Sequence, residues 1–135
     1  MLFGEEHVRR YQETDGAEGY IWANGTTILL LTTTGRRSGK SRTSPLIFQP
    51  YGADYLVVAS KGGADQAPDW YLNLEASPTV GVQIKEDKFV ARARTASPDE
   101  RPHMWRVMTQ VWPDYDRYQK KTRRELPVVV LQRAS

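Results

Sequence analysis

Apolar residues recur at helical spacing at the start of the chain. Phe3, Val8 and Tyr11 are separated by charged residues, and this period predicts a weakly amphipathic helix over residues 2–14. A glycine-containing turn follows and ends it. Residues 1–15 are therefore interpreted as an N-terminal helical segment, and the sequence leaves open whether that segment is truncated or mobile.

Short β-branched and apolar runs, separated by turn residues, dominate the rest of the chain. A short strand around Tyr20 and Trp22 leads into an Asn24-Gly25 turn, the signature of a type I′ hairpin. Pro45 cannot donate to a sheet ladder, which indicates an edge strand or a bulge at that point. The expected strands cover residues 20–22, 26–34, 42–50, 54–60, 79–85, 88–95 and 128–132.

Proline and acidic residues mark the expected helices. Pro68 suits the first turn of a helix over residues 68–76, and Ser97-Pro98 followed by two acids has the composition of a helix start. That second helix carries Met104, Trp105 and Met108 as expected core residues. Pro113 interrupts it, and residues 115–124 continue as one or two further helical turns. Hairpins dominate and no βαβ rhythm appears, so we expect a mainly β (α+β) fold of about six to seven antiparallel strands with two to four peripheral helices.

Composition removes several classes of function. The 135 residues are interpreted as one domain, residues 1–135. With no cysteine, the chain has no disulfide, no thiolate nucleophile and no Cys-based zinc or iron–sulfur site. His7 and His103 are lone histidines without ligand spacing, so no metal is expected. No apolar run approaches the roughly 20 residues of a membrane span, and no signal peptide is recognisable.

A basic turn between two expected strands is the most informative segment. It holds two glycines, several hydroxyl side chains, and the cations Arg36, Arg37, Lys40 and Arg42. Glycines allow a tight turn that exposes backbone N–H groups, and arginine matches phosphate or carboxylate oxygens in a bidentate manner. The segment therefore predicts an anion-binding site.

The residue types of this turn allow three other interpretations. A P-loop is disfavoured because Gly35 to Ser41 is one residue short and a strand follows where a helix is required. A solvated basic hairpin that binds nothing does not need its flanking glycines and hydroxyls. Nucleic-acid binding is not expected, because the cations elsewhere are well mixed with acids.

Three motifs occur in chain order: residues 33–40 read Thr-Thr-Gly-Arg-Arg-Ser-Gly-Lys, residues 58–63 read Val-Ala-Ser-Lys-Gly-Gly, and residues 68–74 read Pro-Asp-Trp-Tyr-Leu-Asn-Leu. Together they resemble the deazaflavin (coenzyme F420)-dependent nitroreductase family, found in actinobacteria. The resemblance runs from about Tyr20 to the last expected strand and implies a split β-barrel. Cofactors of this type carry a phosphodiester and a polyglutamate tail, which gives the basic turn an obvious partner.

The resemblance implies three groups of cofactor-binding residues. The first group would hold the phosphate and acidic tail, and the others would line the deazaflavin ring. The groups are Arg36, Arg37, Ser38, Lys40 and Arg42; Thr43, Ser44 and Pro45 with Val58, Ala59, Ser60 and Lys61; and Asp69, Trp70, Tyr71 and Asn73. The sequence alone leaves open that Trp70 and Tyr71 are plain core residues.

Hydride transfer from the reduced deazaflavin to an organic acceptor, such as a quinone or nitroaromatic compound, is the activity that the resemblance implies. Trp112, Tyr115 and Tyr118 fall three apart, and we expect one helical face that covers a flat acceptor. Tyr115, Tyr118 and Ser60 are the expected catalytic residues, as hydrogen-bond donors or proton relays. Trp112 and Ile47 stand where the family has tyrosines, so substrate preference is open, and Tyr115 and Tyr118 can also be explained as packing.

Two other functions use the same fold: an FMN-dependent flavoprotein and a non-catalytic cofactor carrier. The density of arginines favours the longer acidic tail of the deazaflavin over FMN. We expect a cytoplasmic protein with at most peripheral contact with the inner face of the cell membrane, because the apolar face of residues 2–11 is weak. A homodimer is expected as a partner arrangement, without a defined interface.

Overall fold

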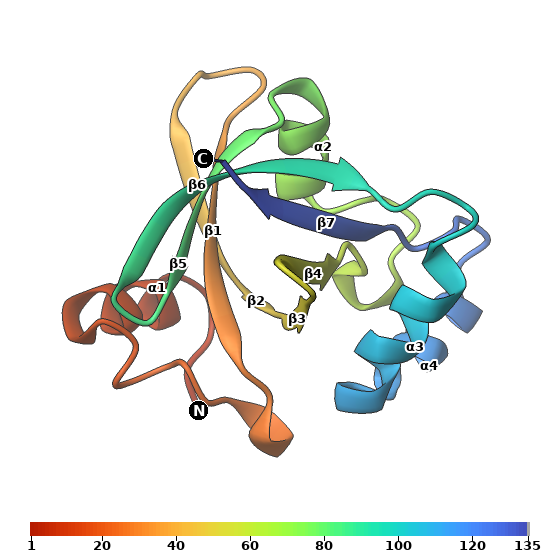
Figure 1. The fold of residues 1–135 in the computed structure, drawn as a ribbon, viewed down its shortest axis with the longest axis horizontal. Helices are drawn as coiled ribbons and strands as arrows, with labels where there is room; N and C mark the ends of the chain where they lie inside the picture. Colours follow the sequence, from red (N-terminus) through yellow and green to blue (C-terminus); the bar gives the residue numbers. More distant parts are fainter. Residues whose placement is uncertain (135) are drawn as a thin grey trace.

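An antiparallel sheet of seven strands forms the centre of the molecule (Figure 1). The computed structural model describes residues 1–134. In space the strands follow the order β2-β1-β5-β6-β7-β4-β3. Their bounds are β1 (Ile28–Thr34), β2 (Ser41–Ile47), β3 (Gln49–Tyr51), β4 (Asp54–Val58), β5 (Thr79–Ile84), β6 (Asp87–Thr95) and β7 (Val128–Arg133).

The two edge strands show that this sheet curls. β2 and β3 stand at opposite ends of the spatial order, yet only Phe48 separates them in the chain. The edges of a flat seven-stranded sheet cannot be one residue apart, so the sheet bends until its two ends meet. The result is a split barrel of antiparallel strands, the fold that the resemblance implied. Pro45 lies on edge strand β2, as its missing N–H requires.

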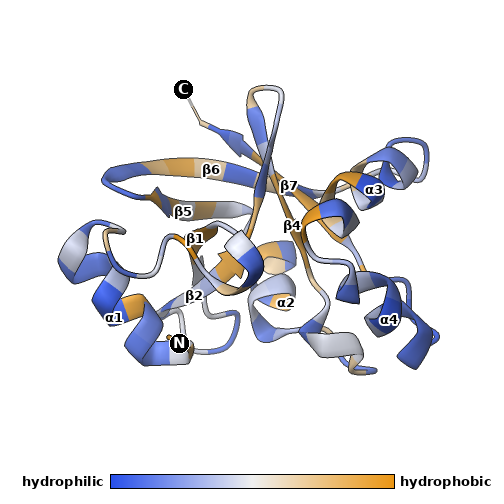
Figure 2. Ribbon diagram, turned by 90° about the horizontal axis from the view of Figure 1, so that it is seen from below, coloured by the Kyte–Doolittle hydropathy of each residue, from blue (hydrophilic) through white to orange (hydrophobic). Residues whose placement is uncertain are grey.

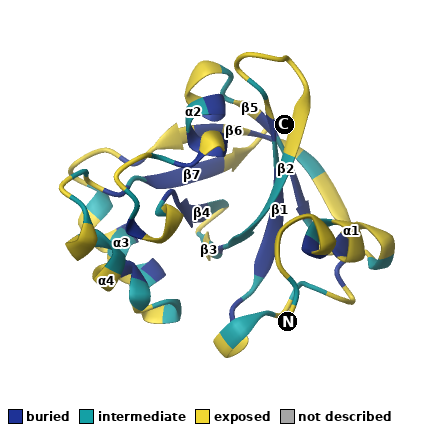
Figure 3. Ribbon diagram, turned by 180° about the vertical axis from the view of Figure 1, so that it is seen from behind, coloured by how far each residue is buried: buried dark blue, intermediate teal, exposed yellow. Residues whose placement is uncertain are grey.

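Four α-helices surround the barrel: α1 (Gly4–Thr14), α2 (Asp69–Ala76), α3 (Arg101–Val111) and α4 (Asp114–Lys121). α1 packs against β2 and α2 against β1, while α3 contacts β4 and β7. α4 lies beside α3 and contacts the one-turn 3-10 helix Lys61–Gly63. Figure 2 shows α4 as a largely hydrophilic helix at the edge of the molecule, and Figure 3 shows β1, β4 and β7 as largely buried strands, whereas β2 is exposed at one end. None of the helices within residues 1–134 has the length and apolar character needed to cross a membrane.

The continuous apolar runs of β1 and β7 are explained by burial on both faces of the sheet. Leu29 and Leu31 belong to the core inside the barrel, whereas Ile28 and Leu30 pack against α1. Alternate residues of β7 divide in the same way between the barrel interior and the cluster under α3. A strand that is buried on both faces shows no alternation of apolar and polar residues. Each such side chain contributes about 1.5–3 kcal/mol on burial.

α1 is tied to the sheet by Tyr11, whose side chain is fully buried. Its hydroxyl donates to the carbonyl oxygen of Ile28 at 2.9 Å and accepts from the backbone N–H of Lys85 at 2.8 Å. A buried hydroxyl with both partners fixes the helix against β1 and against the turn that follows β5. The N-terminal helix is therefore part of the packed structure.

The expected boundaries need three corrections. The strand around Tyr20 is reduced to one bridge between Ile21 and Thr27, although Asn24 and Gly25 both have the positive φ of a type I′ turn. The strand expected over residues 42–50 is broken at Phe48 into β2 and β3. The second helix begins at Arg101 instead of Ser97, because Pro102 has no N–H to bond back to residue 98; residues 98–100 form a turn that the Arg101 N–H closes on the Ser97 carbonyl oxygen at 3.0 Å.

Candidate functional site

Two adjoining cavities open where α1, β2 and α2 meet. The first has a volume of about 470 Å³ and is lined mainly by apolar and aromatic side chains. The second, of about 610 Å³, lies along the basic turn. Ser44 of β2 and Trp70 of α2 contribute to both cavities, so the two spaces meet at these residues. A ligand with a flat apolar part and an anionic part could occupy both.

The second cavity is a cationic groove between the β1–β2 turn and the start of α2. Arg36, Arg37, Ser38 and Arg42 line one side, and Asp69 and Asn73 line the other. The guanidinium of Arg36 lies 3.4 Å from the carboxylate of Asp69. Within the part of the chain that the structure describes, Arg37 and Arg42 form no ion pair, so two cations remain available to an anion.

The two glycines of the turn act in different ways. Gly39 has a φ of 70°, the left-handed conformation that glycine adopts without cost. Gly35 needs no positive φ, but a Cβ there would lie 2.8 Å from the Ser38 hydroxyl and 3.2 Å from the Lys40 carbonyl oxygen. The Gly35 N–H donates to that same carbonyl at 2.8 Å. The turn is thus closed on itself before any ligand binds.

Asn73 orients Arg36 from behind the groove. Its side chain is buried, and its Oδ1 accepts from the Arg36 backbone N–H at 3.1 Å and from Nη1 at 2.9 Å. Its Nδ2 donates to the Thr33 hydroxyl at 3.3 Å. A buried amide with these partners restricts the arginine to one direction and lowers the entropy lost when a ligand binds.

Most of the predicted cofactor-binding residues line one of the two cavities. In the groove these are Arg36, Arg37, Ser38, Arg42, Thr43, Ser44, Asp69, Trp70 and Asn73. In the apolar cavity they are Ser44, Pro45, Val58, Ser60, Lys61 and Trp70. Segments more than thirty residues apart in the sequence are therefore brought together as the resemblance implied.

Three predicted residues lie outside both cavities in the described structure. Ala59 is fully buried in the barrel core. Tyr71 packs in the same core and its hydroxyl forms a hydrogen bond with the Thr95 hydroxyl at 2.8 Å. Lys40 is exposed, and its backbone N–H donates to the Ser38 hydroxyl. None of the three lines the space that a ligand would fill.

The predicted acceptor residues Trp112, Tyr115 and Tyr118 all line the apolar cavity. They do not share one helical face, because Trp112 ends α3 and only the two tyrosines belong to α4. The Trp112 indole N–H instead donates to the Tyr118 hydroxyl at 3.3 Å, and the two tyrosine rings lie 6.1 Å apart. Trp112 is thus brought next to Tyr118 by a hydrogen bond, and not by a shared helical face as was expected.

Tyr115 is the most buried of these three residues, with 5% of its surface exposed. Burial, together with the neighbouring Tyr118, raises the pKa of Tyr115 well above its ordinary value. The phenol therefore stays protonated at neutral pH and can donate a hydrogen bond. No partner for its hydroxyl occurs among residues 1–134, which leaves that donor free for a ligand in the cavity.

The N-terminal segment also contributes to the site, although no motif in the sequence indicated this. Phe3, Gly4, His7 and Trp22 line the apolar cavity. The ring of Trp22 lies 5.7 Å from that of Trp112, so the two ends of the chain meet across the cavity. His7 is buried and its Nε2 donates to the Gly19 carbonyl oxygen at 2.8 Å, which holds α1 against the following loop. Within the described chain no cluster of side chains could hold a metal ion.

Comparisons with known proteins agree with this geometry. The family model described as F420H(2)-dependent quinone reductase matches residues 3–133. An F420H(2)-dependent quinone reductase of Mycobacterium tuberculosis strain H37Rv is 35% identical over 130 residues, which cover 94% of this chain and 87% of the relative.

Two solved structures share both fold and sequence with this chain. The structure of an F420-H2 dependent reductase is 42% identical, with a TM-score of 0.72, and covers 78% of this chain and 93% of its own. A structure titled a domain-swapped dimer is 38% identical, with a TM-score of 0.74, and covers 93% of this chain and 96% of its own.

Proposed function

Because the chain belongs to the F420H(2)-dependent quinone reductase family, we propose that it reduces quinones with reduced coenzyme F420 at the two joined cavities. The observation that carries this proposal is the junction at Ser44 and Trp70. An apolar cavity for a flat ring continues there into a groove that offers arginine to a phosphodiester and an acidic tail. The residues present thus fit the cofactor.

The alternatives that the sequence left open are not needed. Family membership makes coenzyme F420 the cofactor and the chain an oxidoreductase, so neither FMN nor a non-catalytic carrier is required. Reduction of nitroaromatic compounds, and any contact with a membrane surface, remain predictions.

The chain's own contribution is to bind and orient the cofactor and the acceptor and to exclude water from them. When bound, the reduced deazaflavin supplies a hydride. Asn73 and Asp69 hold Arg36 in the groove, which fixes one end of the ligand. The aromatic side chains Trp22, Trp112 and Tyr118 enclose the acceptor side, and the free hydroxyl of Tyr115 donates to an acceptor oxygen as negative charge develops there. Ser60 offers a second hydroxyl from the segment that leads into the 3-10 helix beside α4.

Titration of the purified protein with coenzyme F420 and separately with FMN, followed by fluorescence, tests the proposal. We expect micromolar or tighter binding of F420, weak binding of FMN, and F420H2-dependent reduction of a soluble quinone. Failure to bind F420 would overturn the proposed function, as would binding without reduction of any quinone.

Tyr115→Phe is expected to lower kcat about tenfold, because one hydrogen bond to a developing charge contributes about 1.5 kcal/mol. The dissociation constant of F420 should change less than twofold. Steady-state kinetics with a quinone and a fluorescence titration measure the two quantities. Tyr51→Phe is the control, because its hydroxyl contacts His103 on the exterior. An equal loss in stability, cofactor binding and turnover would assign Tyr115 to packing instead.

Glu5→Gln is expected to strengthen F420 binding by about two- to fivefold at low salt. Glu5 is the carboxylate that α1 places at the cationic groove, where it opposes an anionic ligand. The gain should shrink as salt rises, because exposed charges are screened. The adjacent Glu6 does not line the groove, so Glu6→Gln serves as the control. A weaker binding of F420 by the Glu5 variant would show that this carboxylate assists the ligand.

A homodimer is also proposed, because a similar structure is titled a domain-swapped dimer. Analytical ultracentrifugation across a concentration series tests it. A sedimentation coefficient of the monomer at every concentration would contradict the proposal.

A further inference from the structure

Arg124 lies between α4 and β7 and reaches back to the segment after β4. Its guanidinium donates to three carbonyl oxygens: Nε to Ala64 at 2.7 Å, Nη2 to Ser60 at 2.9 Å, and Nη1 to Ala59 at 3.2 Å. All three acceptors belong to one stretch of six residues. A planar guanidinium presents its donors in fixed directions, so this pattern holds the backbone of that stretch in one shape.

The stretch that Arg124 holds is one wall of the apolar cavity. Ser60, Lys61 and Gly62 line that cavity. Lys61, Gly62 and Gly63 have φ values of 46°, 63° and 87°, three consecutive residues in the left-handed region. A non-glycine residue in that region costs about 1–2 kcal/mol. Such a conformation persists only when surrounding contacts hold it.

The same segment joins this wall to α4, the helix that carries Tyr115 and Tyr118. The Arg124 carbonyl oxygen accepts from Gln119 Nε2 at 2.8 Å, and the Thr122 hydroxyl donates to Asp65 at 2.8 Å. The Arg124 side chain thus contacts the Ser60–Gly62 wall of the cavity, while the Arg124 backbone is bonded to α4, the helix that carries the predicted acceptor residues. This role could not be predicted from the sequence, because four of residues 120–124 are basic and are typical of an exposed helix end.

We propose that Arg124 is a positioning residue that fixes the Ser60–Gly62 wall against α4 and so sets the distance between bound cofactor and acceptor. The inference rests on the proposed function of the cavity. Arg124 touches neither ligand and acts through the backbone that it holds. Lysine carries the same charge but cannot reach three carbonyls at once, so charge alone does not replace it.

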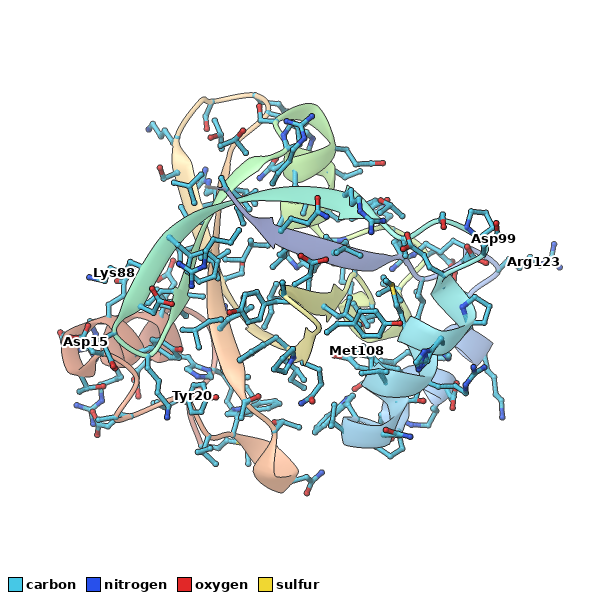
Figure 4. All side chains as sticks on the ribbon, viewed as in Figure 1. Asp15, Tyr20, Lys88, Asp99, Met108 and Arg123 are labelled. Carbon is cyan, nitrogen blue, oxygen red and sulfur yellow. The ribbon has the colours of Figure 1, made fainter. Side chains whose placement is uncertain are left out.

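The variants Arg124→Ala and Arg124→Lys, with Arg123→Ala as control, test the proposal. Arg123 is exposed and lies at the periphery of the molecule (Figure 4). The first measurement is hydrogen exchange in the ligand-free protein at the amides of Gly63 and Ala64, which donate within the stretch. We expect Arg124→Ala to raise their exchange rates at least about tenfold, and Arg123→Ala to leave them within about twofold.

The second measurement separates cofactor affinity from turnover. We expect Arg124→Ala to lower kcat with a quinone about 10- to 100-fold, the size of loss typical of residues that orient a site from behind. Its affinity for F420 should decrease less than tenfold. The kcat of Arg124→Lys should lie between that of the alanine variant and that of the wild type. Arg123→Ala should match the wild type.

The outcomes distinguish the inference from the proposed function. If the wild type fails to bind F420 while exchange at Gly63 and Ala64 still depends on Arg124, the proposed function is overturned, but the positioning of the Ser60–Gly62 wall by Arg124 is supported. If exchange in Arg124→Ala rises equally at strand amides such as Val129 and Leu131, Arg124 supports global stability only and the proposal is overturned. Unchanged kcat and KM in a folded Arg124→Ala variant would overturn it as well.

Discussion

Replacing Arg36 and Arg42 together with alanine is expected to weaken binding of F420 by about 100-fold, or about 3 kcal/mol. Each guanidinium lines the groove, and a charge-assisted hydrogen bond to phosphate or carboxylate contributes about 1.5 kcal/mol. Arg36 is already oriented by Asn73, so little entropy is lost when it engages a ligand. Fluorescence titration at fixed ionic strength measures the change.

Lys40→Ala is the matched control for this double variant. Lys40 belongs to the same turn and carries the same charge, but its side chain does not line the groove. Its removal should change the affinity less than about threefold, through long-range charge alone. If the double variant binds F420 as tightly as the wild type, the groove is not the anion site. If Lys40→Ala weakens F420 binding as much as the double variant does, net charge and not the geometry of the groove determines the affinity.

The fold could be predicted from the sequence because its strands are short, β-branched and punctuated by turns. The Asn24-Gly25 turn and edge residue Pro45 behaved as their backbone chemistry requires. Curling of the sheet could not be read from local pattern, since it depends on the pairing of strands far apart in the chain. The break at Phe48 has the same origin: β2 pairs with β1 up to Ile47, whereas β3 pairs with β4 from Gln49 onward, so the chain changes its partner strand at this residue.

The motifs predicted segments that line the two cavities, but not which side of each segment faces them. Successive side chains of a strand point to opposite faces. Val58, at the end of β4, lines the cavity, whereas Ala59 enters the core. On α2 the cavity side is formed by Asp69, Trp70 and Asn73, which share a helical face, and Tyr71 falls on the buried side.

The contacts of Arg124 with the cavity wall, and those of Trp22 with Trp112, could not be predicted from the sequence for another reason. The carbonyls that Arg124 contacts lie 60 to 65 residues away in the chain. The ring of Trp22 meets that of Trp112, from the other end of the chain. Neither residue belongs to a motif, and a basic or aromatic residue in isolation has too many ordinary explanations. Only the three-dimensional arrangement shows their partners.

Gly63→Ala is expected to lower the free energy of unfolding by about 3 kcal/mol or more. A Cβ at Gly63 would lie 2.5 Å from the carbonyl oxygen of Tyr118 and 2.9 Å from its Cα. Both atoms belong to the backbone of α4, so relief requires the whole helix to move away from the wall. The φ of 87° adds strain for any residue with a side chain. Urea unfolding followed by circular dichroism measures the loss.

Gly62→Ala separates the contact with α4 from the backbone strain. Gly62 has a φ of 63°, but a Cβ there would meet no atom within 4 Å. Its replacement should cost only about 1–2 kcal/mol, the penalty of a left-handed alanine. The remaining difference between the two variants then reports the packing of the wall against α4. Because Tyr115 and Tyr118 move with that helix, the folded Gly63 variant should also show a higher KM for quinone at nearly unchanged F420 affinity. Equal stability of the two variants would mean that α4 is not held at this contact, and the acceptor side of the cavity would then need another source of rigidity.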